Sequence, residues 1–279
     1  MSIDNEVIKI EFVSFDRVAE IYDETRWVSE LIIEKLWRLI NENCALTENS
    51  RILDLGFGTG RISLPFVRKH KISVIGIDIS DEMLKKAKHK LNTQSSAGKV
   101  SLVYGDVCYL PFRPQSFDLI LIVHLLHLVK QWKRVLVEGD KCLVPKTKQI
   151  ICAWVHINWH ETTPFQIYWE KIRTQGYKRD PIGLKNIQEC VDFLKQMKYS
   201  FQKFTYYENI NVPVTKAFSM LEQRAFSHSW NVSEKIHFKA LEEVKEWMHQ
   251  HKEIQSIPAK ASLEIYQFRN LISSVRTKD

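Results

Sequence analysis

No Cys-x-x-Cys pair occurs among the 279 residues of this sequence, and its cysteines are few and scattered. The five are Cys44, Cys108, Cys142, Cys152 and Cys190. An odd, widely spaced set argues against a disulfide framework and favours a reducing compartment. His156 and His160 are four residues apart, but they follow a predicted strand and do not share a helix face. We interpret them as ordinary loop residues and expect no metal site.

Long apolar runs, linkers and internal repeats are also missing. The longest apolar run, residues 119–129, is too short to cross a bilayer and contains two histidines. The first six residues, MSIDNE, lack the basic start and apolar core of a signal peptide. No Gly/Ser-rich or Pro-rich stretch divides the chain, and no repeat of solenoid or propeller length is visible. We therefore expect a cytoplasmic protein with no membrane span, folded as a single domain over residues 1–279.

The charge balance is basic, with a formal net charge of +7 and a pI near 9.0. A basic surface would suit phosphate-rich partners such as nucleic acid or anionic lipid. However, the lysines and arginines are spread along the chain and are often mixed with glutamate, as in residues 239–245. This pattern favours solvated helix faces, so charge alone does not indicate a nucleic-acid enzyme.

Apolar strands alternate with helices through the first half of the chain. Strands are expected at 51–55, 73–79, 100–104, 117–123 and 149–155, and helices at 15–26, 28–43, 61–70, 80–91 and 132–143. Strands without polar alternation are covered on both faces, which is typical of parallel βαβ units. The second half adds expected helices at 164–174, 187–197, 214–226 and 234–251, and late strands at 201–212 and 261–268. The fold class is therefore α/β.

A glycine-rich loop, DLGFGTG at 54–60, stands between the first strand and the following helix. Glycines let the backbone turn sharply and let a ligand approach closely. The loop follows the carboxyl end of its strand, where open α/β sheets bind nucleotides. On its own, however, such a loop could be only a tight turn.

Two acidic residues strengthen the nucleotide interpretation. Asp78 ends the second strand, where a carboxylate can accept hydrogen bonds from both hydroxyls of an adenosine ribose. Asp106 follows the third strand, within reach of an adenine amino group. Each could instead cap a helix or lie in a solvated loop. Three features in order after three successive strands favour a nucleoside ligand.

The glycine spacing distinguishes between cofactors. Dinucleotide folds favour Gly-x-Gly-x-x-Gly, with a helix N-terminus facing a pyrophosphate. This chain has Gly-x-Gly-x-Gly after Asp54, whose negative charge suits a cationic ligand better than a pyrophosphate. S-adenosylmethionine carries a sulfonium and an ammonium group, so it is favoured over NAD(P).

On these motifs the chain resembles the class I S-adenosylmethionine-dependent methyltransferases, in the broad group that includes the ubiquinone/menaquinone C-methyltransferases. The matching stretches lie within 15–155: FDRVAEIYD at 15–23, ILDLGFGTGR at 52–61, GIDISDEM at 76–83, YGDVCYLPF at 104–112 and FDLILIVHLLHLV at 117–129. The resemblance implies a Rossmann-like, mostly parallel seven-stranded sheet with helices on both faces and an antiparallel last strand. It also implies S-adenosyl-L-methionine as cofactor and S-adenosyl-L-homocysteine as product.

The resemblance also implies a set of cofactor-binding residues. The set is Tyr22, Asp54, Gly56, Gly58, Gly60, Asp78, Ile79, Asp106, Val107 and Val123. The methionine end is expected beside 54–58, with Tyr22 closing over it. The ribose is expected on Asp78, and the adenine beside Ile79 and residues 106–107.

Signals for the acceptor side are weaker. Methyl transfer from a sulfonium mainly needs orientation of donor and acceptor, with proton removal for some acceptors. His124 and His127 follow the fourth strand and are candidate bases, because imidazole titrates near neutral pH. His228 is a third candidate. Structural, hydrogen-bonded histidines are the alternative for each.

The acceptor class follows from missing motifs. The fourth strand is not followed by the Asn/Asp-Pro-Pro-Tyr turn that is typical of methyltransferases acting on adenine amino groups. No cysteine lies where C5-pyrimidine methylation would need it. We therefore expect a small-molecule acceptor and regard nucleic acid as a disfavoured partner. The alternatives are an RNA or protein methyltransferase, suggested only by the basic balance, a cofactor-binding protein without turnover, and an NAD(P)-dependent oxidoreductase.

Residues 15–155 are expected to form the cofactor-binding core, with helical elaborations at 156–200 and 213–258 on the acceptor side. About 48 residues separate the sixth strand from the last, far more than a usual connection. Such insertions often serve as lids. The residues expected to face the pocket are Leu221, Arg224, Phe226, His228 and Trp230. The alternative is that these helices cover the sheet edge or form a homodimer contact.

Overall fold

The computed structural model describes residues 12–26, 29–93, 98–145, 148–159, 163–177 and 181–270. The acidic start of the chain and His160 lie outside the described residues. A seven-stranded sheet has the order β3-β2-β1-β4-β5-β7-β6. Its strands are β1 Arg51–Leu55, β2 Ser73–Asp78, β3 Lys99–Tyr104, β4 Leu119–Val123, β5 Gln149–Trp159, β6 Tyr199–Pro213 and β7 Ser256–Asn270. The α/β class and each expected strand are thus confirmed, and His156 lies within β5 instead of a loop.

The sheet is mixed. β1 pairs in parallel with β2 and β4, and parallel pairing continues to β3 and β5 at either side. β7 is antiparallel to both of its neighbours, β5 and β6. Because β1, β2 and β4 lie side by side in parallel, their carboxyl ends meet at one edge of the sheet, where a ligand site is expected.

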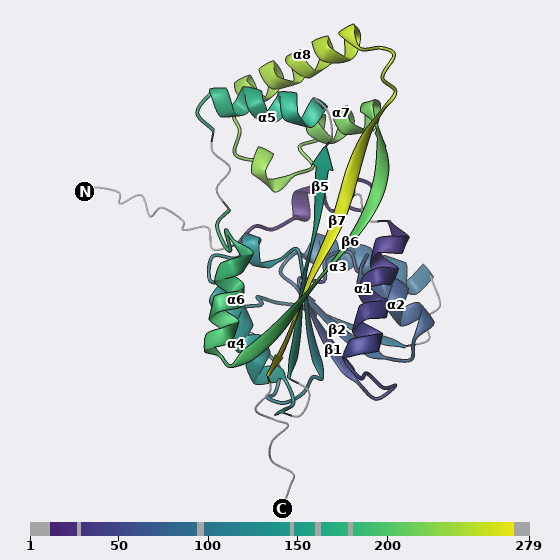
Figure 1. Ribbon diagram of the computed structural model, residues 1–279, viewed down its shortest axis with the longest axis vertical. Coiled ribbons are helices and arrows are strands. Elements are labelled where there is room, and N and C mark those ends of the chain that lie inside the picture. Colours follow the sequence, from purple (N-terminus) through teal and green to yellow (C-terminus); the bar gives the residue numbers. More distant parts are fainter. Residues whose placement is uncertain are drawn as a thin grey trace, which may run out of the picture.

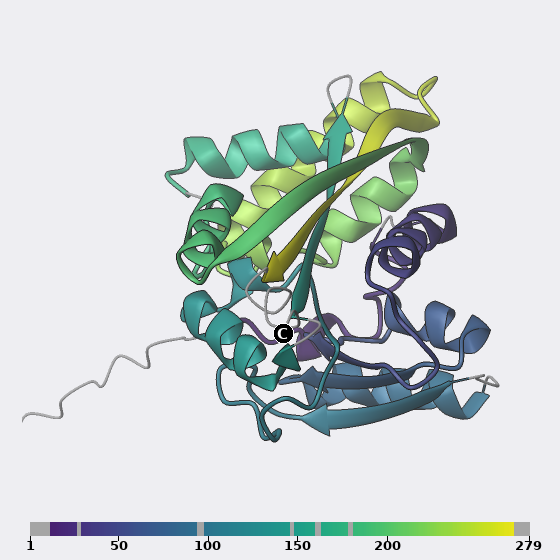
Figure 2. The same ribbon diagram turned by 60° about the horizontal axis from the view of Figure 1, so that its bottom comes forward.

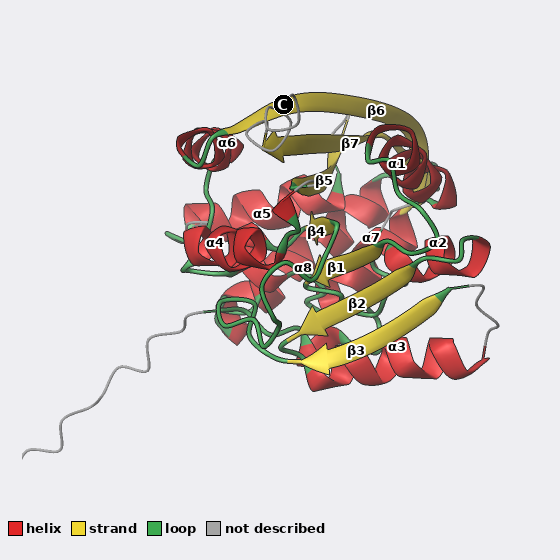
Figure 3. Ribbon diagram, turned by 90° about the horizontal axis from the view of Figure 1, so that it is seen from below, coloured by secondary structure: helices red, strands yellow, loops and turns green. Residues whose placement is uncertain are grey.

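Helices cover both faces of the sheet (Figure 3). α1 Glu30–Asn43, α2 Ser63–Lys69 and α3 Asp81–Thr93 lie on one face, and α4 Trp132–Cys142 and α6 Ile187–Gln196 on the other. Ile52 of β1 packs with the first group, whereas the next residue, Leu53, packs with the second. Both side chains are fully buried, which explains why these strands show no polar alternation.

The long strands β5, β6 and β7 continue past the core and carry a second layer of helices at their far end (Figures 1 and 2). This layer, which we call the cap, comprises residues 163–177 and 214–255. It contains α5 Pro164–Thr174, α7 Val214–Glu222, the 3-10 turn Ser227–Ser229 and α8 Glu234–Gln250, which share an apolar cluster around Tyr168 and Met220. α6 packs instead on the core, so only part of the expected 156–200 elaboration lies in the cap.

The segment 15–26, expected to be a helix, has a short 3-10 turn at Asp16–Val18 followed by further turns. Tertiary contacts outweigh helical propensity here, because the Asp16 carboxylate accepts hydrogen bonds from Ser80 Oγ at 2.5 Å and from the Glu82 amide at 3.2 Å. These bonds fix the segment at the start of α3. No helix among the described residues is both long and apolar enough to cross a membrane.

Candidate active site

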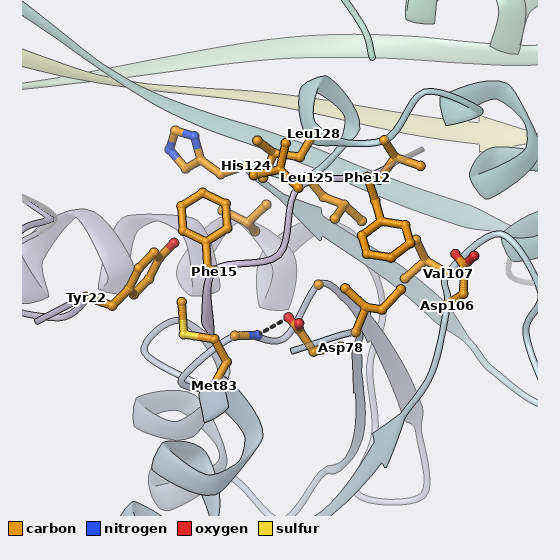
Figure 4. Close-up of a pocket in the computed structure, with 16 residues that line it drawn as sticks. Phe12, Phe15, Tyr22, Asp78, Met83, Asp106, Val107, His124, Leu125 and Leu128 are labelled. Atoms are coloured by element: carbon orange, nitrogen blue, oxygen red, sulfur yellow. Dashed lines mark hydrogen bonds between the residues drawn. The ribbon is translucent and has the colours of Figure 1, made fainter. Parts of the chain in front are cut away.

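A cavity opens at the carboxyl ends of β1, β2, β3 and β4, under the N-terminal segment 12–26 (Figure 4). Its lining residues come from loops that are far apart in sequence. They are Phe12, Val13, Phe15, Tyr22, Gly56, Gly58, Asp78, Ile79, Met83, Asp106, Val107, Val123, His124, Leu125, Leu128 and Val129. Eight of the ten residues expected to bind the cofactor therefore lie around one cavity.

Asp78 is fixed in the cavity wall by the glycine loop. Its Oδ2 accepts a hydrogen bond from the Gly58 amide at 2.7 Å (Figure 4), and its Oδ1 accepts one from the Ser80 amide at 2.9 Å. Burial raises the pKa of Asp78, and the amides of Ser80 and Gly58 oppose this effect. Because a carboxylate offers about four acceptor positions, each oxygen keeps capacity for a ligand hydroxyl.

The two ends of the cavity differ in chemistry. Phe12 and Val107 lie beside Asp106 at one end, as Figure 4 shows. Asp106 Oδ1 accepts a hydrogen bond from the Cys108 amide at 2.8 Å, which orders this loop. Phe15 and Tyr22 form the other end, with ring centroids 5.7 Å apart in an edge-on arrangement. The first end suits a purine, and the second is a separate aromatic wall.

Asp54 and Gly60, both expected at the cofactor, do not line the cavity. Asp54 is only 3% exposed, and its Oδ2 accepts a hydrogen bond from Ser63 Oγ at 2.5 Å. The side chain thus points toward the first turn of α2. Gly60 has a φ of +74°, and a Cβ there would lie 2.7 Å from Leu64. Both residues therefore help to shape the glycine loop, and neither lines the cavity.

Burial raises the pKa of Asp54 from 3.8 to about 7, with Ser63 opposing and Asp78 adding to the shift. The folded state therefore favours the protonated form. The stability from this group is complete below the ordinary pKa and is lost as pH rises through the folded pKa. We expect the free energy of unfolding of the ligand-free protein to fall by roughly 2–3 kcal/mol between about pH 5 and pH 8.

Denaturant unfolding across this pH range measures the effect, and Asp54→Asn should flatten the decline. The control is Asp81→Asn, which changes an exposed carboxylate on α3. Equal slopes in wild type and Asp54→Asn would show that Asp54 is ionised throughout.

Among the three candidate bases, only His124 lines the cavity. It has a φ of +54°, and its Nε2 accepts a hydrogen bond from the Val155 amide at 2.8 Å. Burial, together with the charges of nearby residues such as His127 and Arg26, lowers the pKa of His124 to about 3. A neutral imidazole whose Nε2 accepts must carry its proton on Nδ1, so the ring has one donor and no free lone pair with which to act as a base.

The other two histidines lie away from the cavity. The His127 ring is 6.3 Å from that of His124, centroid to centroid. His228 belongs to the cap, where its ring lies 4.0 Å from that of Trp169. Neither position places an imidazole at the cavity wall.

One of the five expected cap residues packs on a residue that lines the cavity, and a second packs on Arg26, which does not line it. Trp230 packs edge-on against Phe15 at 5.0 Å, and the Phe226 ring lies 5.2 Å from the Arg26 guanidinium. Leu221 is buried within the cap, and His228 packs there as described. Arg224 donates to the carbonyls of Ser229 and Val232 and pairs with Glu234, all within the cap. The cap thus covers the wall without lining the cavity.

Sequence reasoning did not assign Phe15, Met83 and the apolar residues after β4 to the site. Phe15 and Met83 lie at the ends of two matching stretches, so their positions carried a weak signal. The run after β4 was more informative, because Leu125, Leu128 and Val129 continue the apolar pattern beyond the end of the strand.

Comparison with known proteins agrees with this geometry. A family model for the methyltransferase domain matches residues 52–146. Over 182 residues the chain is 33% identical to a demethylmenaquinone methyltransferase of Tropheryma whipplei, covering 64% of this chain and 74% of that protein. The chain belongs to the S-adenosylmethionine-dependent methyltransferases. A second relative of this methyltransferase is the ubiquinone/menaquinone biosynthesis C-methyltransferase UbiE of Geotalea daltonii, 31% identical over 49% of this chain and 60% of that protein.

Solved structures share the fold of this methyltransferase at low identity. A Haemonchus contortus N-methyltransferase in complex with S-adenosylhomocysteine has a TM-score of 0.51 and 16% identity, covering 90% of this chain and 57% of that chain. The [4+2]-cyclase SpnF has a TM-score of 0.53 and 17% identity, covering 90% and 93%. The second name shows that this fold also occurs in a protein named for a different reaction.

Proposed function

We propose that this methyltransferase holds S-adenosylmethionine in the cavity and transfers its methyl group to a small molecule bound beside the Phe15–Tyr22 wall. When bound, the cofactor supplies a methyl group activated by a positively charged sulfur. The observation that carries the proposal is the Asp78 carboxylate, which is fixed by two backbone amides and lines a cavity that also contains Ile79, Asp106 and Val107.

The residues fit the parts of the cofactor. Asp78 would accept hydrogen bonds from the ribose hydroxyls, and Ile79 and Val107 would contact the adenine. Gly56 and Gly58 would approach the methionine end, where Gly58 leaves open space because no atom lies within 4 Å of its missing Cβ. Asp54 would act through Ser63 and the loop, and Gly60 through packing.

The aromatic wall on the acceptor side favours a small, planar acceptor molecule. The wall is aromatic, and the cap covers it through Trp230, which limits the space for a macromolecule. The named activities of the two relatives make hydroquinones the first acceptors to test. The core at 15–155 and the cap would act as one domain, because β5 and β7 run unbroken from one to the other.

A transfer assay with methyl-labelled S-adenosylmethionine tests the proposal. We expect label in phenolic or hydroquinone acceptors and none in total RNA or in a protein extract. The Asp78→Ala variant is the negative control. Label in RNA or protein would contradict the proposal, and S-adenosylhomocysteine binding without transfer to any acceptor would favour a binding protein without turnover.

A further inference from the structure

The segment 12–26, which we call the roof, closes one side of the cavity. Phe12, Val13, Phe15 and Tyr22 of the roof line this side, and the loops that follow the strands line the other. The space between them is about 70 Å³, far below the roughly 300–1,000 Å³ of pockets that hold small molecules. A nucleoside joined to an amino acid needs more room, so the cofactor can enter only when the roof moves.

Side chains that can rotate cause part of this crowding. Phe12 lies beside Asp106 and Val107, at the end of the cavity that we assign to the adenine (Figure 4). Met83 of α3 also lines the cavity. Because such side chains can turn aside within the same backbone fold, the roof can close again over a bound ligand if the bonds at its two ends re-form.

Asp16 holds the first part of the roof to the start of α3. Its Oδ1 accepts hydrogen bonds from Ser80 Oγ at 2.5 Å and from the Glu82 amide at 3.2 Å. The Ser80 amide in turn donates to Asp78 at 2.9 Å, so this contact adjoins the carboxylate assigned to the ribose. Neither Asp16 nor Ser80 lines the cavity. We call the Asp16–Ser80 contact the first latch.

Asp23 holds the other end of the roof to the glycine loop. Its Oδ1 accepts a hydrogen bond from Thr59 Oγ1 at 2.6 Å, and Thr59 is only 1% exposed. Lys90 of α3 pairs with Asp23 and also donates to the Thr59 carbonyl at 3.0 Å. The Asp23–Thr59 contact is the second latch. Because Asp23 directly follows Tyr22, this latch fixes a residue of the aromatic wall, although Asp23 and Thr59 themselves do not line the cavity.

We propose that the roof is a gate for the cofactor, and that the two latches hold it shut and set the rates of cofactor entry and release. This inference rests on the proposed function. Each latch is a hydrogen bond to a carboxylate, which is stronger than one between neutral groups. Since neither latch includes a residue of the cavity lining, both latches form with or without ligand, and the loss of one favours opening in both states. The rates of entry and release should therefore rise together while the affinity stays the same.

Surface plasmon resonance of the immobilised protein with S-adenosylhomocysteine gives both rate constants. Asp23→Ala should raise the association and dissociation rate constants by about 10-fold each, and Asp16→Ala should do the same. The double variant should reach about 100-fold, because the two latches share no partner. Thr59→Val should match Asp23→Ala, whereas Thr59→Ser keeps the hydroxyl and should behave as the wild type.

The matched control is Glu20→Gln. Glu20 also belongs to the roof and pairs with Lys86 of α3, but Glu20 is exposed, and ion pairs of this kind contribute little. This variant should leave both rate constants unchanged. A second measurement needs no variant: hydrogen exchange of residues 15–26 in the wild type should slow when S-adenosylhomocysteine saturates the protein, because roof side chains then contact the ligand.

The outcomes separate the two proposals. Failure of S-adenosylhomocysteine to bind the wild type would overturn the proposed function itself. Normal binding with unchanged rate constants in the double variant, or with exchange at 15–26 that does not respond to ligand, would overturn only the gate. Weaker binding of a folded Asp23→Ala variant at an unchanged association rate would show that Asp23 acts on affinity. Faster association with unchanged dissociation would show that the latches do not re-form over the ligand, which also contradicts the gate.

Discussion

Asp78→Ala should weaken the binding of S-adenosylhomocysteine by about 100-fold or more. A hydrogen bond to a charged group contributes about 1.5–3 kcal/mol, and two ribose hydroxyls would lose their acceptor together. The substitution also removes the acceptor of the Gly58 amide, which loosens the adjacent glycine loop. Titration calorimetry of the folded variant measures the loss directly.

The matched control for this experiment is Asp81→Ala, three residues along the chain. Asp81 is exposed in the first turn of α3 and pairs with Lys85 at 2.9 Å, away from the cavity lining. The Asp81→Ala variant should bind S-adenosylhomocysteine as tightly as the wild type. An unchanged dissociation constant in Asp78→Ala would mean that this carboxylate serves only the loop and the start of α3.

Gly60→Ala should destabilise the ligand-free protein by about 2–5 kcal/mol. The backbone there has a φ of +74°, which costs an alanine about 1–2 kcal/mol. In addition, the new methyl group would lie 2.7 Å from Leu64 and 2.8 Å from Phe57, both buried, and overpacking of this kind costs about 1–3 kcal/mol more. Denaturant unfolding without ligand measures the sum.

Gly58→Ala is the comparison that separates packing from backbone strain. Its φ is +56°, but its Cβ would meet no atom within 4 Å, so only the backbone cost of about 1–2 kcal/mol applies. Because Gly58 lines the cavity, this variant should lose more affinity for S-adenosylhomocysteine than stability. Equal destabilisation by the two substitutions would contradict the close packing described around Gly60.

The sequence predicts the sheet well because both faces of its strands are buried. Ile52 and Leu53 need apolar surroundings on opposite sides, and that requirement leaves a continuous apolar run that marks the strand. The loop after each strand could likewise be placed at one sheet edge. The sequence therefore predicts that Asp78 and Asp106 lie at a common ligand site, and both line the cavity.

The sequence does not predict which way a side chain points within the fold. Asp54 follows the motif, yet a buried hydroxyl on Ser63 draws its carboxylate away from the cavity. The segment 15–26 has a helical pattern, but Asp16 bonds to the start of α3 and the segment turns instead. The ordinary pKa of histidine makes His124 a candidate base in the sequence, but burial lowers this pKa and the Val155 amide occupies Nε2.

The most direct test of the central claim is calorimetry of the purified protein with S-adenosylhomocysteine and, separately, with NAD. The cavity has a carboxylate suited to a ribose, and the glycine loop beside it donates its Gly58 amide to that carboxylate. We predict saturable binding of S-adenosylhomocysteine and no response to NAD. Saturable binding of NAD with no response to S-adenosylhomocysteine would contradict the account.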